Sequence, residues 1–326
     1  MVRVECMEVV RHQQTAPDDP VMGMQMDDTP LFSVLIANHN GGRYLMDAIA
    51  SVRAQTYSNW EIILVDDASA DNSGELYREL GKDSRIHVFS NGERKGCGHT
   101  KRRCADLAHG ALCGFLDSDD ALAPGALETM VREHRKHREA SLVYSTHFCC
   151  DERLRVQHVS KYPCAIPEGM TFLEYGKGAV SHFAVFKTDR YRKTAGISPD
   201  LTIAEDHDLY FKLEEVGAIR FIPEALYYYR TGTGSNTSLG ENALRAQFWD
   251  YVGMMDACRR RNLSIEDVVV PQFVDSFKQH IALVDRIYRS KTYRVGALVT
   301  WPYRFLKSFF RKRKIPAPAV PEGRFP

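Results

Sequence analysis

Short apolar runs alternate with stretches of helical spacing between residues 32 and 116, and this alternation most constrains the fold. Residues 32–37 and 60–65 are apolar and rich in β-branched side chains, which favours buried strands. Between them, Leu45, Ile49 and Val52 recur at helical spacing. Further helices are expected near 73–81 and 99–108, and further strands near 86–90 and 111–116. Strands that alternate with helices form a mostly parallel sheet, so we expect an α/β fold with helices on both faces.

Polar side chains follow three of these strands at the point where each strand ends. They are Asn38, His39 and Asn40 after the first strand, Asp66 and Asp67 after the second, and Asp117, Ser118 and Asp119 after the last. Open α/β sheets bind their ligands outside the carboxyl ends of the strands. The sequence therefore predicts a binding site at this edge of the sheet.

Residues 114–120 form a short apolar run that ends in three carboxylates. In an extended chain, Asp117 and Asp119 would point the same way, because side chains alternate along a strand. Mg²⁺ and Mn²⁺ prefer oxygen ligands, and a site with one or two carboxylates leaves positions free for substrate phosphates. This segment is a candidate metal site. The alternative is a solvated turn before a helix that begins near Pro124.

The second half of the chain is less regular. Strands are expected at 142–145, 184–186 and 226–230, and a helix opens at 204–213. Glu205, Asp206 and Asp208 lie in the first turn of that helix, where the helix dipole favours acidic side chains. From residue 239 onward the pattern is helical.

Charge is distributed unevenly along the chain. Residues 286–314 hold ten Lys or Arg and no acidic residue, whereas the whole chain carries a net charge of +1, so the remainder is acidic. Aromatic side chains between Trp301 and Phe310 lie among these basic residues, and an amphipathic helix of this composition binds anionic membrane surfaces. The alternative is a helix packed on the protein with its basic end in solvent. The acidic remainder disfavours nucleic acid as a partner.

The eight cysteines form no Cys-x-x-Cys pair and no zinc-binding spacing, so we expect free thiols in a reducing compartment. No apolar run approaches the roughly 20 residues that a membrane-spanning helix needs, and no secretory signal is evident. These features predict a cytoplasmic protein, peripheral on the inner face of the membrane if the basic tail binds it.

Five segments, in order, resemble the family-2 inverting glycosyltransferases, which have the GT-A (Rossmann-like) fold. They are Ser33 to Asn40, the pair Ser51 to Tyr57 and Glu61 to Ser69, Phe115 to Asp120 with Pro124, Glu205 to Leu209, and Tyr229-Arg230. The resemblance covers about residues 32–238. It implies a mixed, mostly parallel sheet flanked by helices, with a helical C-terminal extension.

The resemblance implies a GT-A catalytic domain (31–238). Residues 1–30 lack clear periodicity and are expected to form a loosely ordered extension, and the pattern at 239–326 predicts a helical C-terminal region with the basic tail. The catalytic domain would divide into a nucleotide-binding half (31–122) and an acceptor half (123–238). The implied reaction moves a hexosyl or N-acetylhexosaminyl group from a nucleotide sugar, usually a UDP-sugar, to a hydroxyl of a glycan or lipid-linked glycan.

The resemblance also assigns roles to individual residues. Asp119 matches the direct metal ligand, Asp117 lies near the ribose and the metal, and Asp206 matches the catalytic base. Asp67 matches the carboxylate that binds the uracil ring. The other residues expected at the nucleotide are Ala37, Asn38, His39, Asn40, Lys101 and Ser118. Glu205, Asp208, His182, Arg230 and Thr233 are candidates for acceptor or phosphate contacts, and Glu205 and Asp208 are alternatives for the base.

The implied chemistry agrees with the residue types. A divalent ion, Mn²⁺ or Mg²⁺, neutralises the departing diphosphate, and a carboxylate removes the proton from the acceptor hydroxyl. The residues after Tyr229-Arg230 depart from the family, because many relatives carry a His shortly after this pair and this chain has Thr231 to Asn236. The alternative function is a non-catalytic, membrane-associated scaffold that binds nucleotide sugars. A phosphoryl-transfer enzyme is disfavoured because no Gly-x-x-x-x-Gly-Lys-Ser/Thr loop exists.

Overall fold

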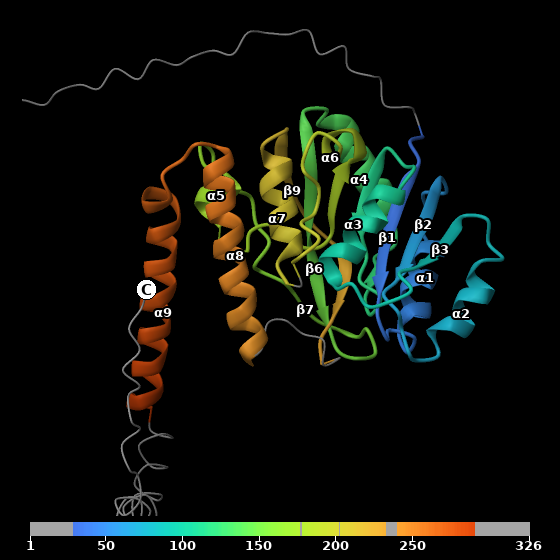
Figure 1. The fold of residues 1–326 in the computed structure, drawn as a ribbon, viewed down its shortest axis with the longest axis horizontal. Coiled ribbons are helices and arrows are strands. Elements are labelled where there is room, and N and C mark those ends of the chain that lie inside the picture. Colours follow the sequence, from blue (N-terminus) through green and yellow to red (C-terminus); the bar gives the residue numbers. More distant parts are fainter. Residues whose placement is uncertain (1–28, 177, 202, 233–239, 291–326) are drawn as a thin grey trace, which may run out of the picture.

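The computed structural model describes residues 29–176, 178–201, 203–232 and 240–290. One mixed sheet runs through the molecule, with helices on both faces and two helices, α8 and α9, at one side (Figure 1). The strand order is β3-β2-β1-β4-β8-β6-β9-β5, and β7 pairs with β6. The predicted extension at residues 1–28 and the tail beyond residue 290 lie outside the described residues.

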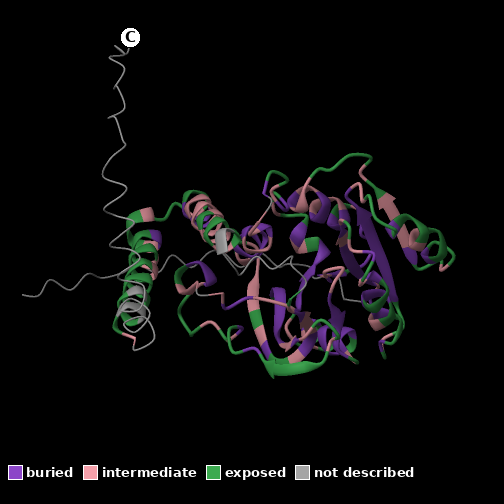
Figure 2. Ribbon diagram, turned by 90° about the horizontal axis from the view of Figure 1, so that it is seen from below, coloured by how far each residue is buried: buried purple, intermediate pink, exposed green. Residues whose placement is uncertain are grey.

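The first four strands of the chain are parallel and form one half of the sheet. They are β1 (Phe32–Asn38), β2 (Trp60–Asp66), β3 (Ile86–Ser90) and β4 (Leu112–Phe115). In β1, Val34 and Ile36 belong to the apolar core on one face and Leu35 to the core on the other, because successive side chains point to opposite faces. Both faces are therefore apolar, and Figure 2 shows the buried strands at the centre of the molecule.

Three helices connect these parallel strands. They are α1 (Leu45–Arg53), α2 (Ser73–Leu80) and α3 (Cys97–Leu107). Leu45, Ile49 and Val52 of α1 are fully buried, which confirms the amphipathic helix that their spacing predicts. Since each strand returns in the same direction, the carboxyl ends of β1, β2 and β4 meet at one edge.

The rest of the sheet is mixed. β8 (Ala184–Lys187) pairs antiparallel with β4 and β6 (Ala140–Cys150), whereas β9 (Ala218–Arg230) pairs parallel with β6 and antiparallel with β5 (Ala121–Leu122). The remaining elements are α4 (Ala126–Lys136), β7 (Val156–Val159), α5 (Phe172–Tyr175), α6 (Thr188–Tyr191) and α7 (Glu205–Glu214). The single sheet therefore contains strands from both the first half (31–122) and the second half (123–238) of the predicted catalytic domain.

The C-terminal part of the described chain is an antiparallel pair of long helices, α8 (Gly240–Arg260) and α9 (Ile265–Arg289). Met254, Ala257 and Cys258 of α8 are buried in the same apolar cluster as Leu209 and Leu213 of α7. α9 packs on α8 from outside and is the outermost helix in Figure 1. Among the described residues, no helix is long and apolar enough to span a membrane.

The structure confirms the predicted α/β class and corrects several element boundaries. The strands predicted at 142–145 and 226–230 are the middle of β6 and the end of β9, both of which are longer. Their outer parts carry polar and charged side chains, so the apolar pattern does not mark them. All seven cysteines in the described part of the chain are free, as predicted.

Candidate active site

A cavity of about 720 Å³ opens at the carboxyl ends of β1 and β4 and is bordered by the N-terminus of α7 and by α8. It brings together most of the residues singled out from the sequence. Those that line it are Ala37, His39, Asn40, Lys101, Asp117, Ser118, Asp119, His182, Glu205, Asp206 and Arg230. Asn38, Asp67 and Asp208 are buried and do not line it. Thr233 lies outside the described residues.

The acidic segment after β4 is a turn. The strand ends at Phe115, and the backbone N–H of Asp120 donates to the carbonyl of Asp117 over 3.1 Å. The expectation that Asp117 and Asp119 share a direction because the chain is extended is therefore wrong. Both side chains nevertheless line the cavity.

The third carboxylate of this turn, Asp120, anchors it to β9. Its two oxygens accept hydrogen bonds from the Tyr227 hydroxyl at 2.8 Å and from the backbone N–H of Arg230 at 2.7 Å. Burial, together with the neighbouring Asp117 and Asp119, raises the pKa of Asp120 well above its usual value. The sequence gives Asp120 no role, and its partners lie about a hundred residues away, so nothing local could reveal one.

Arg230 joins the same turn to the rest of the cavity wall. Its guanidinium donates to the backbone carbonyls of Asp119 and Glu152 and forms an ion pair with Asp47 at 2.8 Å. It also lies over the ring of Tyr44, 4.2 Å from the centroid. Arg230 therefore holds the metal-binding candidate in place while it lines the cavity.

Lys101 lies between the acidic turn after β4 and the acidic first turn of α7. Its ammonium is 2.8 Å from the carboxylate of Glu205 and 3.6 Å from that of Asp117. Burial opposes its charge, but Glu205 and Asp117 outweigh that effect and raise the pKa of Lys101 well above its ordinary value. Cys97 adds a thiol that donates to Glu205 over 3.2 Å. Lys101 therefore links α3, the β4 turn and α7 by charge.

Asp206 occupies the first turn of α7. The residue before the helix, Ala204, has a left-handed backbone (φ 62°), and the carboxylate of Asp206 accepts the backbone N–H of His207 at 2.9 Å. Burial alone would raise the pKa of Asp206, but His207, Lys101 and His182 hold it below its usual value. Asp206 is therefore an anion in the cavity, as a general base must be.

His207 forms a contact that sequence reasoning missed. Its Nδ1 lies 2.8 Å from the carboxylate of Asp250 on α8, and both residues line the cavity. Burial would lower its pKa, but Asp250 and Asp206 raise it to about 9, so the imidazole is protonated at neutral pH. Asp250 lies 43 residues beyond His207 in a helix with no family motif.

His182 lies on an aromatic surface beside the acidic groups. Its ring stacks on Tyr227 and Tyr229, with centroids 4.9 and 5.7 Å away. Tyr229 also lines the cavity. The stacked rings of His182 and Tyr229 give the cavity a flat, partly apolar wall, the kind of surface against which a sugar ring packs.

Two of the predicted site residues, Asp67 and Asp208, also bind neighbouring parts of the protein. Asp67 accepts three hydrogen bonds of 2.8 Å, from the Asn91 side chain and the backbone N–H groups of Lys95 and Gly96, and these lower its pKa although burial opposes them. Asp208 forms a buried ion pair with Lys212 at 2.7 Å and accepts the backbone N–H of Ser198. Asp67 thus fixes the loop at residues 91–96 at the carboxyl end of β2.

Comparisons with known proteins give the family. The model described as "Glycosyl transferase family 2" matches residues 33–196. Chondroitin synthase of Escherichia coli is 30% identical over 212 residues, which cover 64% of this chain and 30% of that protein. Hyaluronan synthase of Pasteurella multocida is 28% identical over 227 residues, which cover 68% of this chain and 22% of that protein. The matched segment thus spans less than a third of either relative.

A solved structure gives the fold. The crystal structure of S. aureus TarS 1-349 in complex with UDP-GlcNAc superposes with a TM-score of 0.54 at 18% sequence identity, over 68% of this chain and 66% of that chain. Its similarity supports the GT-A-type architecture. Since the family model matches residues 33–196, half of the chain, the chain belongs to glycosyl transferase family 2.

Proposed function

We propose that the protein is an inverting glycosyltransferase that moves a sugar from a nucleotide-sugar donor to a hydroxyl acceptor. The observation that carries the proposal is the convergence of Asp117, Asp119 and the anionic Asp206 on one cavity at the carboxyl edge of the sheet. An acidic turn on one wall and a separate carboxylate at a helix N-terminus provide the two groups that a direct displacement needs.

The proposed donor is a UDP-sugar. Ala37 near the end of β1 and His39 and Asn40 after it line the cavity, and Asp67 follows the neighbouring strand β2. S. aureus TarS has been crystallised in complex with UDP and with UDP-GlcNAc, and this likeness of fold supports the same donor class here. A hexosyl or N-acetylhexosaminyl group is the transferred sugar.

A divalent metal, Mn²⁺ or Mg²⁺, fits the residues present. No group of three or more His, Cys, Asp or Glu among the described residues could hold a metal by itself. Asp117 and Asp119 are two oxygen donors on the cavity wall, and Mg²⁺ typically takes one or two carboxylates and completes its coordination with water and substrate phosphates. Bound there, the ion would neutralise charge on the leaving diphosphate.

Asp206 is the proposed general base. It accepts the proton of the acceptor hydroxyl while the hydroxyl oxygen attacks the anomeric carbon and the nucleoside diphosphate leaves from the opposite side. One displacement of this kind inverts the anomeric centre. A positioned base contributes about 10²- to 10⁴-fold to such a reaction, and the cations around Asp206 keep it ready to accept the proton.

The proposed acceptor is a glycan or a lipid-linked glycan. The relatives named above, a chondroitin synthase and a hyaluronan synthase, suggest polysaccharide synthesis in the cell envelope. The ten basic residues at 286–314 suggest a cytoplasmic protein that is peripheral on an anionic membrane surface.

The test is thermal stabilisation by UDP, UDP-sugars, GDP and dTDP, each with and without Mn²⁺. A ligand at 100 times its Kd raises the free energy of unfolding by about 2.7 kcal/mol. We expect a Mn²⁺-dependent shift with UDP compounds that Asp119→Ala abolishes. Asp206→Asn should keep the stabilisation by UDP and Mn²⁺ but lose sugar transfer. Sugar transfer by this variant would mean that another residue is the base. No shift with any nucleotide would refute the proposed donor site, and binding without turnover would favour a non-catalytic scaffold.

A further inference from the structure

Helix α8 borders the cavity although it lies beyond the residues that match the family model. Ala246, Gln247 and Asp250 of α8 line the same cavity as Asp119 and Asp206. They lie on one side of the helix, since positions three and four residues apart are neighbours on a helix surface. The family motifs alone therefore leave one wall of the cavity undefined, and α8 provides it.

A series of contacts orients this wall relative to the donor end. Asp117 is 3.6 Å from Lys101, and Lys101 is 2.8 Å from Glu205, the neighbour of Asp206. The backbone N–H of His207 bonds to Asp206, and the His207 ring bonds to Asp250. Asp206 therefore lies between the nucleotide end and the α8 wall. In a direct displacement, the acceptor approaches from the side opposite the diphosphate, which here is the α8 side.

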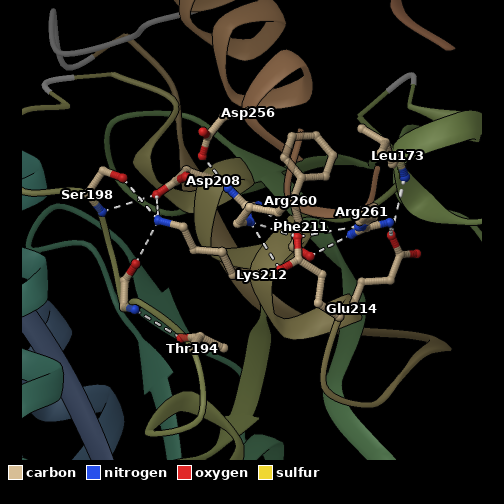
Figure 3. A network of polar contacts seen from close by, with 12 residues as sticks. Leu173, Thr194, Ser198, Asp208, Phe211, Lys212, Glu214, Asp256, Arg260 and Arg261 are labelled. Carbon is tan, nitrogen blue, oxygen red and sulfur yellow. Dashed lines mark hydrogen bonds and ion pairs between the residues drawn. The ribbon is translucent and has the colours of Figure 1, made fainter. Parts of the chain in front are cut away.

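Polar contacts fix α8 to α7 at both ends of their interface, so α8 is a rigidly held side of the cavity. At one end is the His207–Asp250 pair. At the other, Arg261, the residue directly after α8, forms an ion pair with Glu214 at 2.8 Å and donates to the carbonyl of Phe211 (Figure 3). The apolar cluster of α7 and α8 lies between these ends.

We propose that α8 is the acceptor-binding wall, with Asp250 and Gln247 hydrogen-bonded to hydroxyls of an acceptor sugar and His207 as the residue that positions Asp250. The inference rests on the proposed function. The chemistry fits, because one Asp250 oxygen accepts from His207 while the carboxylate as a whole borders the cavity, and a carboxylate can accept hydrogen bonds at both oxygens. Gln247 lines the cavity and also donates to Ser276 of α9 over 2.6 Å, so its side chain lies between the cavity and α9.

The test is steady-state transfer from UDP-GlcNAc to a panel of p-nitrophenyl hexosides and N-acetylhexosaminides. The variants are Asp250→Ala and Gln247→Ala. Asp256→Ala is the control for the first, because it removes another carboxylate of α8 that forms an ion pair but does not line the cavity. Ser276→Ala is the control for the second, because it breaks the same bond to α9 from the other side.

We expect both cavity variants to raise the acceptor KM by about tenfold, the effect of one lost hydrogen bond, with a smaller change in kcat. UDP affinity should stay within twofold of the wild type, and the controls should keep the wild-type KM. Thermal unfolding of all four variants checks that α8 remains docked.

An unchanged acceptor KM in both cavity variants, with UDP binding intact, would overturn the inference and leave the proposed function standing. An equal rise in the controls would show that α8 matters only for packing, which also overturns it. A wild type that binds UDP but glycosylates none of these sugars contradicts the acceptor class inferred here. If the wild-type protein binds no UDP, this result contradicts the proposed function itself.

Discussion

Lys101 is the residue on which the charge balance of the cavity depends. It is buried and lies within ion-pair distance of Glu205 and Asp117, and Asp206 also acts on its charge. Removing one partner of a buried ion pair is costly because the other charge stays buried without compensation. The stability of the folded protein should therefore depend on Lys101 and Glu205 together.

Lys101→Met should lower the free energy of unfolding by about 3–5 kcal/mol, because it leaves the buried carboxylate of Glu205 without its cation. Glu205→Gln in the same chain should recover part of that loss, since it removes this uncompensated charge. Urea unfolding of the two single variants and the double variant measures this coupling. Strictly additive losses would mean that Lys101 and Glu205 do not interact as the 2.8 Å distance indicates.

Individual site residues were predictable to different degrees. Asp117, Asp119 and Asp206 belong to short motifs that resemble the family, and the structure brings all three to one cavity. An extended chain would have pointed Asp117 and Asp119 in the same direction, but this segment is a turn. Asp120 and Asp250 could not be found from the sequence, since their partners come from distant strands and helices.

At the scale of elements, α9 has an outward apolar face. Five of its exposed large apolar side chains form this face, namely Val270, Phe273, Val274, Phe277 and Ile281, with Phe273 54% and Phe277 59% exposed. Their spacing of three and four residues places them along one side of the helix. The chain continues from α9 into the basic, aromatic residues of 291–314. An apolar helix face followed by basic residues suits an anionic lipid surface.

Phe277→Glu should weaken binding of the full chain to phosphatidylglycerol vesicles by about tenfold or more, because burial of a Phe side chain is worth about 1.5–3 kcal/mol. Gln279→Glu is the matched control, since it adds the same charge at an exposed position of α9 outside the apolar face. Vesicle co-sedimentation measures both variants. Equal vesicle binding by the wild type and Phe277→Glu would contradict a lipid-binding face. If light scattering then shows that the wild type and Gln279→Glu are dimers and Phe277→Glu is a monomer, a second copy of the chain covers this face.

Element types were more predictable than element lengths. The buried strands β1 and β2 stand out because they are apolar on both faces, as parallel strands inside a sheet are. The start of β9 and the end of β6 are not apolar runs, and their pairing with each other, a long-range contact, decides their extent. The outward face of α9 was also missed, because helical periodicity alone does not tell which face is covered.

At the scale of the whole molecule, acid should destabilise the fold through buried histidines. His134 of α4 is fully buried, with Nε2 3.0 Å from the carbonyl of Val185. Burial lowers its pKa to about 3, from 6.5 when it is exposed. His147 is affected in the same way, with a pKa of about 4. Both must be neutral in the folded protein.

Because the unfolded chain binds a proton at His134 below about pH 6.5 and the folded protein does not until about pH 3, the free energy of unfolding falls as the pH falls across this interval. The contribution of His134 at pH 5 is about 2 kcal/mol. His134→Gln removes the titrating group, so its stability should fall less steeply between pH 6.5 and 5 than that of the wild type. Urea unfolding at each pH, with the exposed His280→Gln as control, measures the slopes. Identical slopes in all three proteins would contradict a buried, neutral His134.

The overall architecture follows from the strand–helix alternation in the first half, but the joining of the halves does not. The antiparallel β8 connects β4 to β6 and so makes one sheet of the two halves expected from the sequence. β8 has only four residues, too few for a clear strand pattern in the sequence. Its position in the sheet is decided by its long-range pairing with β4 and β6.

The position of α8 beyond the family-matched segment has a consequence for how such proteins diversify. The groups expected at the donor are encoded before residue 231, and the helix that closes the opposite wall is encoded after residue 239. A recombination between these stretches would exchange one wall and keep the other. Descendants could then inherit the same sugar donor and attach its sugar to different polymers, provided that the incoming helix still offered partners for His207 and Glu214.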